Sequence, residues 1–203
     1  AGIRPGSKEG RRILFVGRNF VRKGGPLVVQ AFTILRKKYL WSAELYLAGA
    51  KESDIRDALR ERQIRVEEVD WQKIHLLGDL GSEKLTDYYN LCDVFCMPSY
   101  FEAYGLVFAE ALTYGLPCIG RDKFAMSEFI EDGCTGRLIS GEDAEELALD
   151  LWEVLQDPKY REEVERRREW YLREYSWDKV AQRICSVMEK NERDKDQYRS
   201  AGV

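Results

Sequence analysis

The chain has 203 residues, of which 44% are hydrophobic and 12% aromatic, and it carries a formal net charge of −4. This length suits one domain with a full apolar core, and the composition is that of a folded protein, which excludes a largely disordered chain. The negative net charge argues against a general nucleic-acid binder, because such proteins carry an excess of basic residues.

Residues 1–10 combine glycines, a proline and mixed charges, and we expect them to be a linker or a cloning boundary. From residue 12 onward, short apolar runs alternate with segments whose apolar residues recur at helical spacing. The predicted strands are residues 12–16, 44–49, 74–78, 93–97, 117–120 and 136–139. The predicted helices between them are residues 27–39, 51–63, 83–91 and 125–131, with a further apolar helix that begins near residue 105. This alternation predicts an α/β domain over residues 11–190, with a Rossmann-like parallel sheet of about six strands and helices on both faces.

From residue 143 onward the sequence predicts only helices, over residues 143–156, 158–174 and 176–190. Asp157 and Pro158 should separate the first helix from the second, because proline cannot continue a helix. Ser176 is well placed to cap the third helix. Residues 191–203 hold almost no apolar side chains, which predicts a flexible tail.

Three loops that follow predicted strands carry small or polar residues, at positions 17–18, 78–80 and 99–105. Ligands of doubly wound sheets bind beyond the carboxyl ends of the strands, so these loops should meet at one edge of the sheet. Their convergence predicts a single functional site.

The most informative stretch leads from a small-residue turn into an apolar helix, over residues 98–112. The first backbone N–H groups of that helix, near residues 103–106, lack intrahelical partners and lie at the positive end of the helix dipole, which makes an anion site. Gly105 has no side chain to keep a ligand from the backbone. Glu102 and Glu110 flank the site, because Glu110 lies roughly 7 Å beyond Gly105 along the helix axis. Carboxylates do not bind phosphate but accept hydrogen bonds from hydroxyl groups, such as those of a sugar and a ribose.

This stretch resembles the signature of retaining glycosyltransferases of the GT-B architecture, family 4. The residues that carry the resemblance are Glu102-x7-Glu110, followed by Ala111-x3-Gly115-x-Pro117. The resemblance covers residues 13–187, and that part looks like the C-terminal, nucleotide-sugar-binding half of such an enzyme.

The resemblance implies a metal-independent hexosyltransferase that moves a sugar from a nucleoside diphosphate to an acceptor. The donor base stays open, and no cofactor is expected besides this donor substrate. Acceptor binding would belong to a missing N-terminal domain, as would any contact with a membrane, and the enzyme would act in the cytoplasm. This chain alone should therefore bind the donor but scarcely turn over.

The resemblance also implies roles for individual residues. Arg18 and Lys23 would clamp the diphosphate of the donor and stabilise it as it leaves, and Glu102 would contact the transferred sugar near the reacting centre. Glu110 would accept hydrogen bonds from the ribose hydroxyls. The remaining donor-binding positions are Gly17, Leu80, Ser82, Ala103, Tyr104, Gly105 and Leu106, of which Leu80 and Ser82 would line the nucleobase; Ser82 would also cap the helix that follows.

Each of these roles has a structural alternative. Residues 17–25 could be a solvated basic loop, and residues 78–82 an ordinary strand-to-helix loop. Glu102 could cap the next helix, and Glu110 could lie on a solvent-facing helix surface. For the chain as a whole, the alternatives are a nucleotide-sugar-binding module without a transferase role, or another GT-B enzyme such as a sugar epimerase or phosphorylase.

The sequence departs from the family pattern after the fifth strand. The family usually carries a Gly-Gly pair before Pro-Glu there, whereas residues 121–128 keep only the glutamate. The bulkier side chains are expected to reshape the sugar end of the pocket.

Other conspicuous residues are interpreted as structural. His75 lies inside a predicted strand, Arg22 is expected to be a surface charge, and residues 166–168 are interpreted as a solvated helix face. Five cysteines with a single histidine argue against a zinc site and are interpreted as buried free thiols of a reducing compartment. No apolar run approaches the length of a membrane span, and the first residues lack the apolar core of a signal peptide.

Overall fold

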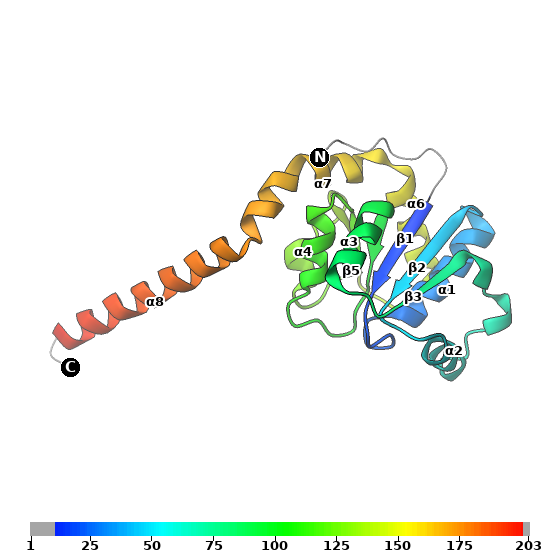
Figure 1. The fold of residues 1–203 in the computed structure, drawn as a ribbon, viewed down its shortest axis with the longest axis horizontal. Coiled ribbons are helices and arrows are strands. Elements are labelled where there is room, and N and C mark those ends of the chain that lie inside the picture. Colours follow the sequence, from blue (N-terminus) through cyan, green and yellow to red (C-terminus); the bar gives the residue numbers. More distant parts are fainter. Residues whose placement is uncertain (1–10, 201–203) are drawn as a thin grey trace.

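The computed structural model describes the backbone of residues 11–200 and the side chains of residues 11–188. Six parallel strands form one sheet in the order β3-β2-β1-β4-β5-β6 (Figure 1). The strands are β1 (Arg11–Val16), β2 (Ala43–Ala48), β3 (Ile74–Gly78), β4 (Val94–Cys96), β5 (Cys118–Arg121) and β6 (Gly136–Ile139). The predicted α/β fold with a Rossmann-like parallel sheet is confirmed. The linker predicted at residues 1–10 lies outside the described residues.

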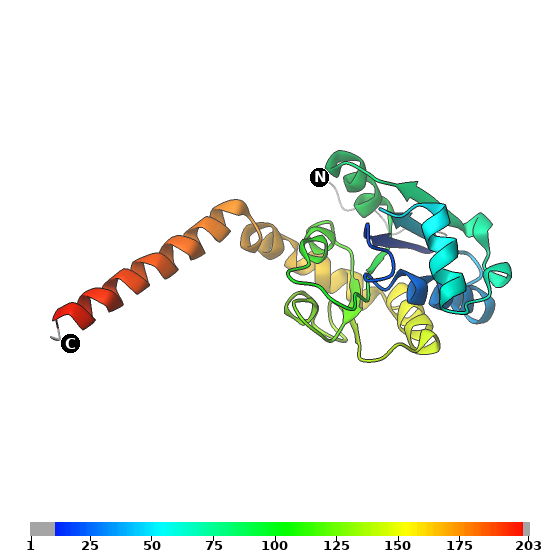
Figure 2. The ribbon, with the colours of Figure 1, turned by 90° about the horizontal axis from the view of Figure 1, so that it is seen from below.

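Helices cover both faces of this sheet (Figure 2). They are α1 (Gly25–Lys38), α2 (Glu52–Glu61), α3 (Ser82–Leu91), α4 (Leu106–Thr113), α5 (Met126–Phe129), α6 (Ala144–Gln156), α7 (Pro158–Glu174) and α8 (Trp177–Ser200). Two short 3-10 helices, η1 (Val66–Glu68) and η2 (Trp71–Lys73), were not predicted from the sequence. In space α1 packs on α6 and α4 packs on α7, so the C-terminal helices complete layers that the first half of the chain begins.

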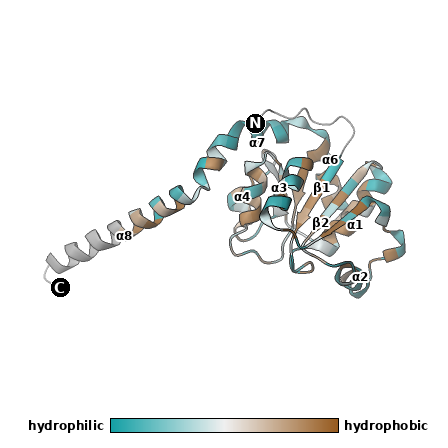
Figure 3. Ribbon diagram, in the orientation of Figure 1, coloured by the Kyte–Doolittle hydropathy of each residue, from teal (hydrophilic) through white to brown (hydrophobic). Residues whose placement is uncertain are grey.

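The central strands form the apolar core. Consecutive residues of β1, among them Leu14 and Phe15, are fully buried, and so is Phe95 of β4. Successive side chains of a strand point to opposite faces, so burial of consecutive apolar residues requires helices on both sides of the sheet. Each of these large side chains stabilises the fold by about 1.5–3 kcal/mol. Figure 3 shows hydrophobic residues along these strands, and no helix in the described part of the chain is both long and apolar enough to cross a membrane.

The strand order reverses between β1 and β4. Ile13 of β1 pairs with Leu45 of β2 on one side and with Val94 of β4 on the other. The chain therefore adds β2 and β3 on one side of β1, and then crosses back to place β4 on the other side of β1. In doubly wound sheets this reversal opens a crevice at the carboxyl ends of the two strands, which is where ligands bind.

The C-terminal helices begin and end largely where the sequence predicts. The Asp157 carboxylate accepts a hydrogen bond from the Lys159 N–H at 3.0 Å, and Asp157 both ends α6 and caps α7. Ser176 Oγ accepts from the Lys179 N–H at 3.2 Å, as expected of the cap of α8. Helix α8 projects away from the body of the domain and continues to Ser200, beyond the predicted end at residue 190 (Figure 1). Of the predicted flexible tail, residues 201–203 lie outside the described residues.

Candidate functional site

The loops that follow β1 and β4 are joined by direct contacts. The backbone N–H of Tyr100 donates to the Arg22 carbonyl oxygen at 2.9 Å, and Arg22 Nη1 donates to the Phe101 carbonyl oxygen at 2.5 Å. Gly24 has a φ of +80°, and a Cβ there would lie 2.3 Å from the Pro98 carbonyl oxygen, so only glycine allows this approach. Arg22, expected to be a surface charge, thus holds the two loops together instead.

Lys23 and Glu102 form an ion pair between the same two loops. The two side chains are only 13% and 12% exposed. Water screens such a pair poorly, which makes its electrostatic interaction stronger than that of an exposed pair. The pair joins two residues predicted to be catalytic. The alternative that Glu102 caps the next helix is wrong, because the N-cap of α4 is Gly105 and α4 has no side-chain cap hydrogen bond.

Arg18, the third residue predicted to be catalytic, lies at the same edge of the sheet. Its Nε donates to Asp79 Oδ1 at 3.2 Å, which links the loop after β1 to the loop after β3. The Arg18 side chain is 84% exposed, so this link is weak and leaves the guanidinium accessible. Among the described residues no hydrogen bond or ion pair joins Arg18 to Lys23 or Glu102, so the three side chains share an edge without forming one cluster.

The ends of β1, β2 and β3 lie side by side through backbone hydrogen bonds. The N–H of Gly17 donates to the Ala48 carbonyl oxygen at 2.9 Å, and the N–H of Gly49 donates to the Gly78 carbonyl oxygen at 2.7 Å. The loops at 17–18, 78–80 and 99–105 therefore meet at one edge, as predicted from the sequence.

The turn before α4 leaves several backbone N–H groups without a partner among the described residues. Gly105 has a φ of +80° and serves as the N-cap, and α4 begins at Leu106. Among the described residues, none accepts a hydrogen bond from the backbone N–H of Ala103, Tyr104, Gly105 or Leu106. Tyr104 and Leu106 are also exposed. Unpaired N–H groups and the positive end of a helix dipole are the features that the sequence predicted for an anion site at these four positions.

Glu110 lies on α4 with a buried partner. The hydroxyl of Tyr89 donates to Glu110 Oε2 at 2.9 Å, and the Tyr89 ring stacks on Tyr114 with their centroids 5.4 Å apart. Burial, together with the Glu110 carboxylate, holds the pKa of Tyr89 far above its usual range. Glu110 itself is exposed. The carboxylate is therefore oriented by Tyr89 while its remaining acceptor positions face outward.

The loop before α3 only partly follows the prediction. Leu80 is half-buried and Ser82 is exposed. The sequence predicted that Ser82 caps the helix, which is wrong: Ser82 is the first residue of α3, Gly81 is the N-cap, and no side chain caps it. The Ser82 hydroxyl therefore makes no capping hydrogen bond at the start of α3.

Two exposed aromatic residues, Phe101 and Tyr104, lie close to Glu102 in the sequence, and each packs on another ring. Phe101 and Phe124 pack edge to face with their centroids 5.1 Å apart, and Tyr104 packs in the same way on Phe129 at 6.0 Å. Phe124 has a φ of +56°, a conformation that is costly for a bulky residue. It lies in the segment where the family pattern has glycines, and its ring packs on Phe101, the residue before Glu102. The predicted change at the sugar end of the pocket stays a prediction.

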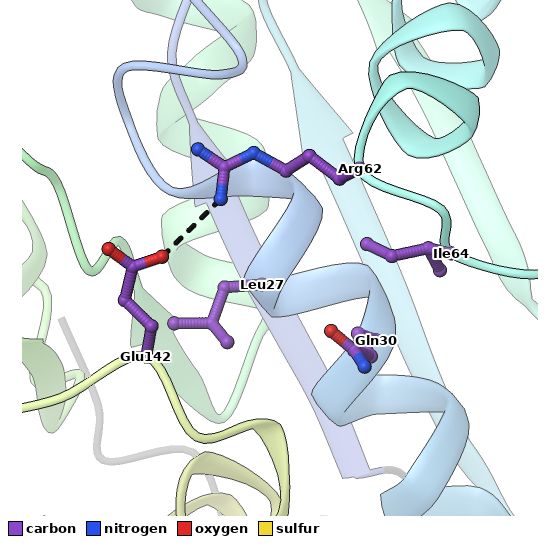
Figure 4. Close-up of a pocket in the computed structure, with 5 residues that line it drawn as sticks. All are labelled: Leu27, Gln30, Arg62, Ile64 and Glu142. Atoms are coloured by element: carbon purple, nitrogen blue, oxygen red, sulfur yellow. Dashed lines mark hydrogen bonds and ion pairs between the residues drawn. The ribbon is translucent and has the colours of Figure 1, made fainter.

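Two hollows open near these loops. One of about 390 Å³ is lined by Arg18, Asn19, Phe20, Val21 and Asp54, between the loop after β1 and the start of α2. The other, of about 240 Å³, is lined by Leu27, Gln30, Arg62, Ile64 and Glu142 (Figure 4). Arg62 and Glu142 reach across this second hollow from different loops and form an ion pair at 3.4 Å.

The histidine and cysteines fit structural roles for the most part. His75 stacks on Tyr46 with ring centroids 4.4 Å apart, as expected of a structural residue. The cysteines Cys92, Cys96 and Cys118 are buried, but Cys134 is half-buried and Cys185 exposed, so the prediction of buried thiols is wrong for the last two. In the part of the chain that the structure describes, no three His, Cys, Asp or Glu side chains are arranged to hold a metal ion.

The architecture and the stretch around Glu102 and Glu110 can be compared with known proteins. A family model described as "Glycosyl transferases group 1" matches residues 4–170 of the chain. The chain belongs to the group 1 glycosyltransferases. The predicted membership of the group 1 glycosyltransferases, with their GT-B type of fold, is thereby confirmed. The assignment to the retaining family 4 and to the C-terminal half of such an enzyme stays a prediction.

Relatives of this group 1 chain include characterised transferases. It is 28% identical over 184 residues to a phosphatidyl-myo-inositol mannosyltransferase of Mycolicibacterium smegmatis, with 90% of this chain and 46% of that protein covered. Among solved structures it is similar to the sucrose-phosphate synthase of Thermosynechococcus elongatus, with a TM-score of 0.75 and 26% identity over 91% of this chain and 46% of the other. It is also similar to a pneumococcal O-GlcNAc transferase solved with UDP and GlcNAc, with a TM-score of 0.70 and 25% identity over 90% of this chain and 37% of the other. The chain thus spans less than half the length of each of these proteins.

Sequence reasoning missed two residues that contact the candidate site. Tyr89, which donates to Glu110, carried no signal because it is one of two adjacent tyrosines on a predicted helix. Arg121 was noted only as part of a departure from the family pattern, yet it is buried, with 4% of its surface exposed. A charged residue is normally exposed, so its burial could not be expected from sequence alone.

Proposed function

We propose that this chain is the C-terminal, donor-binding half of a retaining family 4 glycosyltransferase and binds a nucleoside diphosphate sugar. The observation that carries the proposal is the Lys23–Glu102 pair at the strand reversal, beside the free N–H groups at the start of α4. A cation and unpaired backbone donors suit a diphosphate, and a carboxylate next to them suits sugar hydroxyls.

The proposed donor lies across the carboxyl edge of the sheet. Its base contacts the loop at Leu80 and Ser82, and its ribose hydroxyls donate to Glu110, whose orientation is set by Tyr89. Its diphosphate binds Lys23 and the α4 terminus, and the exposed Arg18 guanidinium closes over it. The transferred sugar lies at Glu102.

The proposed chemistry depends on positioning and on charge stabilisation. A leaving nucleoside diphosphate gains negative charge as the sugar departs, and Arg18, Lys23 and the helix terminus stabilise this charge. Glu102 fixes the sugar so that the acceptor approaches in one orientation. In this proposal the reaction is metal-independent, uses no cofactor besides the donor, and transfers a hexose.

We further propose that a second domain supplies the acceptor site. Two observations support this: the chain spans less than half of each relative described above, and α8 presents an exposed apolar stripe. The stripe consists of Trp177, Ile184, Val187 and Met188. Apolar residues at this spacing lie along one side of a helix and normally pack against another element. Without that domain the chain binds donor but turns over scarcely, and any membrane contact lies outside this half.

Calorimetric titration of the 203-residue chain with UDP, GDP and ADP tests the proposal. UDP is the first candidate, because the pneumococcal transferase was solved with UDP. Selective binding of one nucleotide that Glu110→Gln weakens would support the proposed site. Robust sugar transfer by this chain alone would contradict the proposal that a second domain supplies the acceptor site. If none of the three nucleotides binds, the proposed donor site is wrong.

A further inference from the structure

Arg121 is a buried arginine at the carboxyl end of β5. Its Nη1 donates to the Gly141 carbonyl oxygen at 2.7 Å, and its Nη2 lies 3.5 Å from the Pro98 carbonyl oxygen. The Arg121 guanidinium carbon lies 4.7 Å from the centroid of the Tyr100 ring. Within the described residues no carboxylate pairs with Arg121, and its Nε has no hydrogen-bond partner. A buried charge without an ion pair is costly, which calls for an explanation in terms of what the guanidinium holds.

The Tyr100 ring contacts two guanidinium groups. Arg62 lies 5.1 Å from the Tyr100 centroid, and its Nη1 donates to the Tyr100 hydroxyl at 2.8 Å. That hydroxyl donates in turn to Glu142 Oε2 at 2.8 Å. Figure 4 shows the ion pair between Arg62 and Glu142, which lies beside α1. Arg121 carries the buried one of the two guanidinium groups, and it also reaches the neighbouring carbonyl of Gly141.

These contacts act on the segment that carries Glu102. Arg121 contacts this segment at Pro98 and at Tyr100, and the backbone N–H of Tyr100 donates to Arg22 in the loop after β1. The segment then ends at Glu102, whose carboxylate contacts Lys23. Arg121 therefore joins the ends of β4, β5 and β6 through this segment. Lys23 and Arg22 join the same segment to the loop after β1.

We propose that Arg121 is a positioning residue for the sugar end of the donor site. It fixes residues 98–102 so that the Glu102 carboxylate is presented to the transferred sugar. The planar guanidinium suits this role, because it donates to two carbonyl groups and stacks on an aromatic ring at the same time. The role rests on the proposed function, since it assumes that Glu102 contacts the sugar.

The test uses Arg121→Met, Arg121→Lys and the matched control Arg36→Met. Arg36 is a similar side chain away from the site: its Nη1 donates to the Ala43 carbonyl oxygen at 2.6 Å, its guanidinium carbon lies 5.8 Å from the centroid of the Phe32 ring, and its Nε also lacks a partner. It differs from Arg121 in one respect, because its Nη2 also pairs with the Asp70 carboxylate at 2.8 Å. A loss of affinity or of exchange protection that arises only from removing a buried guanidinium would appear in both methionine variants. An effect on the sugar end would appear only at Arg121.

Two measurements are made on each variant. The first is amide hydrogen exchange at Tyr100, whose N–H bonds to Arg22, compared with amides in the core strands. The second is calorimetric affinity for UDP and for UDP-glucose, or for the matching GDP or ADP pair if that nucleotide binds. Arg121→Met should speed exchange at Tyr100, leave UDP affinity unchanged and reduce the additional affinity contributed by the glucose about tenfold. Arg121→Lys should show a smaller loss, and Arg36→Met none.

Several outcomes would overturn the proposal. One is that Arg121→Met leaves both the hydrogen-exchange rate of the Tyr100 amide and the contribution of the glucose to binding affinity unchanged. Another is an equal loss of UDP and UDP-glucose affinity with faster exchange throughout the core, which would assign Arg121 a general packing role. If Arg121→Met does not fold, the same two measurements on Arg121→Lys decide. If the wild-type chain binds no nucleotide, the proposed function fails, and exchange at Tyr100 still decides whether Arg121 holds the segment.

Discussion

The Lys23 ammonium group contacts the Glu102 carboxylate across the point where the strand order of the sheet reverses. One residue follows β1 and the other follows β4, so the pair forms only when these strands are neighbours. Both residues are also proposed to contact the donor, at its diphosphate and at its sugar. A bound diphosphate must therefore share Lys23 with Glu102, and the two interactions compete.

This competition predicts that Glu102→Gln binds UDP more tightly than the wild-type chain does. The neutral amide holds Lys23 less strongly and removes a negative charge beside the diphosphate, which should raise UDP affinity about threefold to tenfold. The same variant should lose the additional affinity that an attached glucose contributes. Calorimetry with UDP and UDP-glucose measures both effects, and weaker UDP binding by Glu102→Gln would contradict the idea of a shared lysine.

The same pair predicts a loss of stability when one partner is removed. Lys23→Met leaves the Glu102 carboxylate largely buried without its cation, which should lower the free energy of unfolding by about 1–3 kcal/mol. Lys23→Met combined with Glu102→Leu should recover most of this loss, because neither charge then remains. Urea unfolding of the wild type and the two variants measures these free energies of unfolding. Equal values for all three proteins would show that the pair contributes nothing to stability.

Glu110 must be substituted with care, because it also holds Tyr89, whose residue surface is only 2% exposed. Glu110→Ala leaves the buried Tyr89 hydroxyl without an acceptor and should cost about 1–3 kcal/mol of stability. Glu110→Gln keeps an acceptor and should unfold like the wild type while binding the nucleotide about tenfold more weakly. Tyr89→Phe removes the hydroxyl that donates to Glu110 but keeps the carboxylate. It is therefore the control that separates the contact of Glu110 with Tyr89 from its proposed contact with the ribose. Equal affinity of Glu110→Gln and wild type would remove Glu110 from the ribose contact.

Arg18 is expected to act on the ligand and not on the fold. Its ion pair with Asp79 is exposed, so Arg18→Ala should leave thermal unfolding unchanged. Affinity for the nucleoside diphosphate should fall about tenfold, with a weaker dependence on salt than in the wild type. Arg60→Ala removes a similarly exposed pair, with Asp57 on α2, and should change neither property. If both variants lose affinity equally, the effect comes from net charge alone.

Tyr175, at the junction of α7 and α8, predicts an alkaline loss of stability. Burial, and next the neighbouring Tyr171, raises the pKa of Tyr175 from 10.0 to about 12. Between these two pH values the unfolded chain loses the proton first, so the unfolded state binds fewer protons and stability falls as pH rises. The contribution is fully present below pH 10 and lost as pH passes 12. Urea unfolding across this interval should show a shallower fall in Tyr175→Phe, and identical slopes in the two proteins would contradict the assignment.

The sequence predicted the sheet and its helices well because strand and helix signals are local. Apolar runs such as the one ending at Val16 indicate a buried parallel strand wherever its neighbours lie. The contacts at the site were harder to predict, because they depend on strand order. Lys23 meets Glu102, and Arg121 reaches Pro98, only because β4 lies between β1 and β5. The cap of α3 was mispredicted for a local reason: both Gly81 and Ser82 are acceptable caps, and the backbone turn selects the glycine.

The position of β1 between β2 and β4 has a consequence for how the chain folds as it is synthesised. Ile13 can pair with Leu45 early, but its other neighbour, Val94, emerges from the ribosome much later. Until then one edge of β1 is an unpaired apolar strand, which is the kind of surface that associates with other chains. The nascent protein therefore passes through a stage at which β1–β3 are complete and the ligand edge does not yet exist. Protection by a chaperone would matter most at that stage.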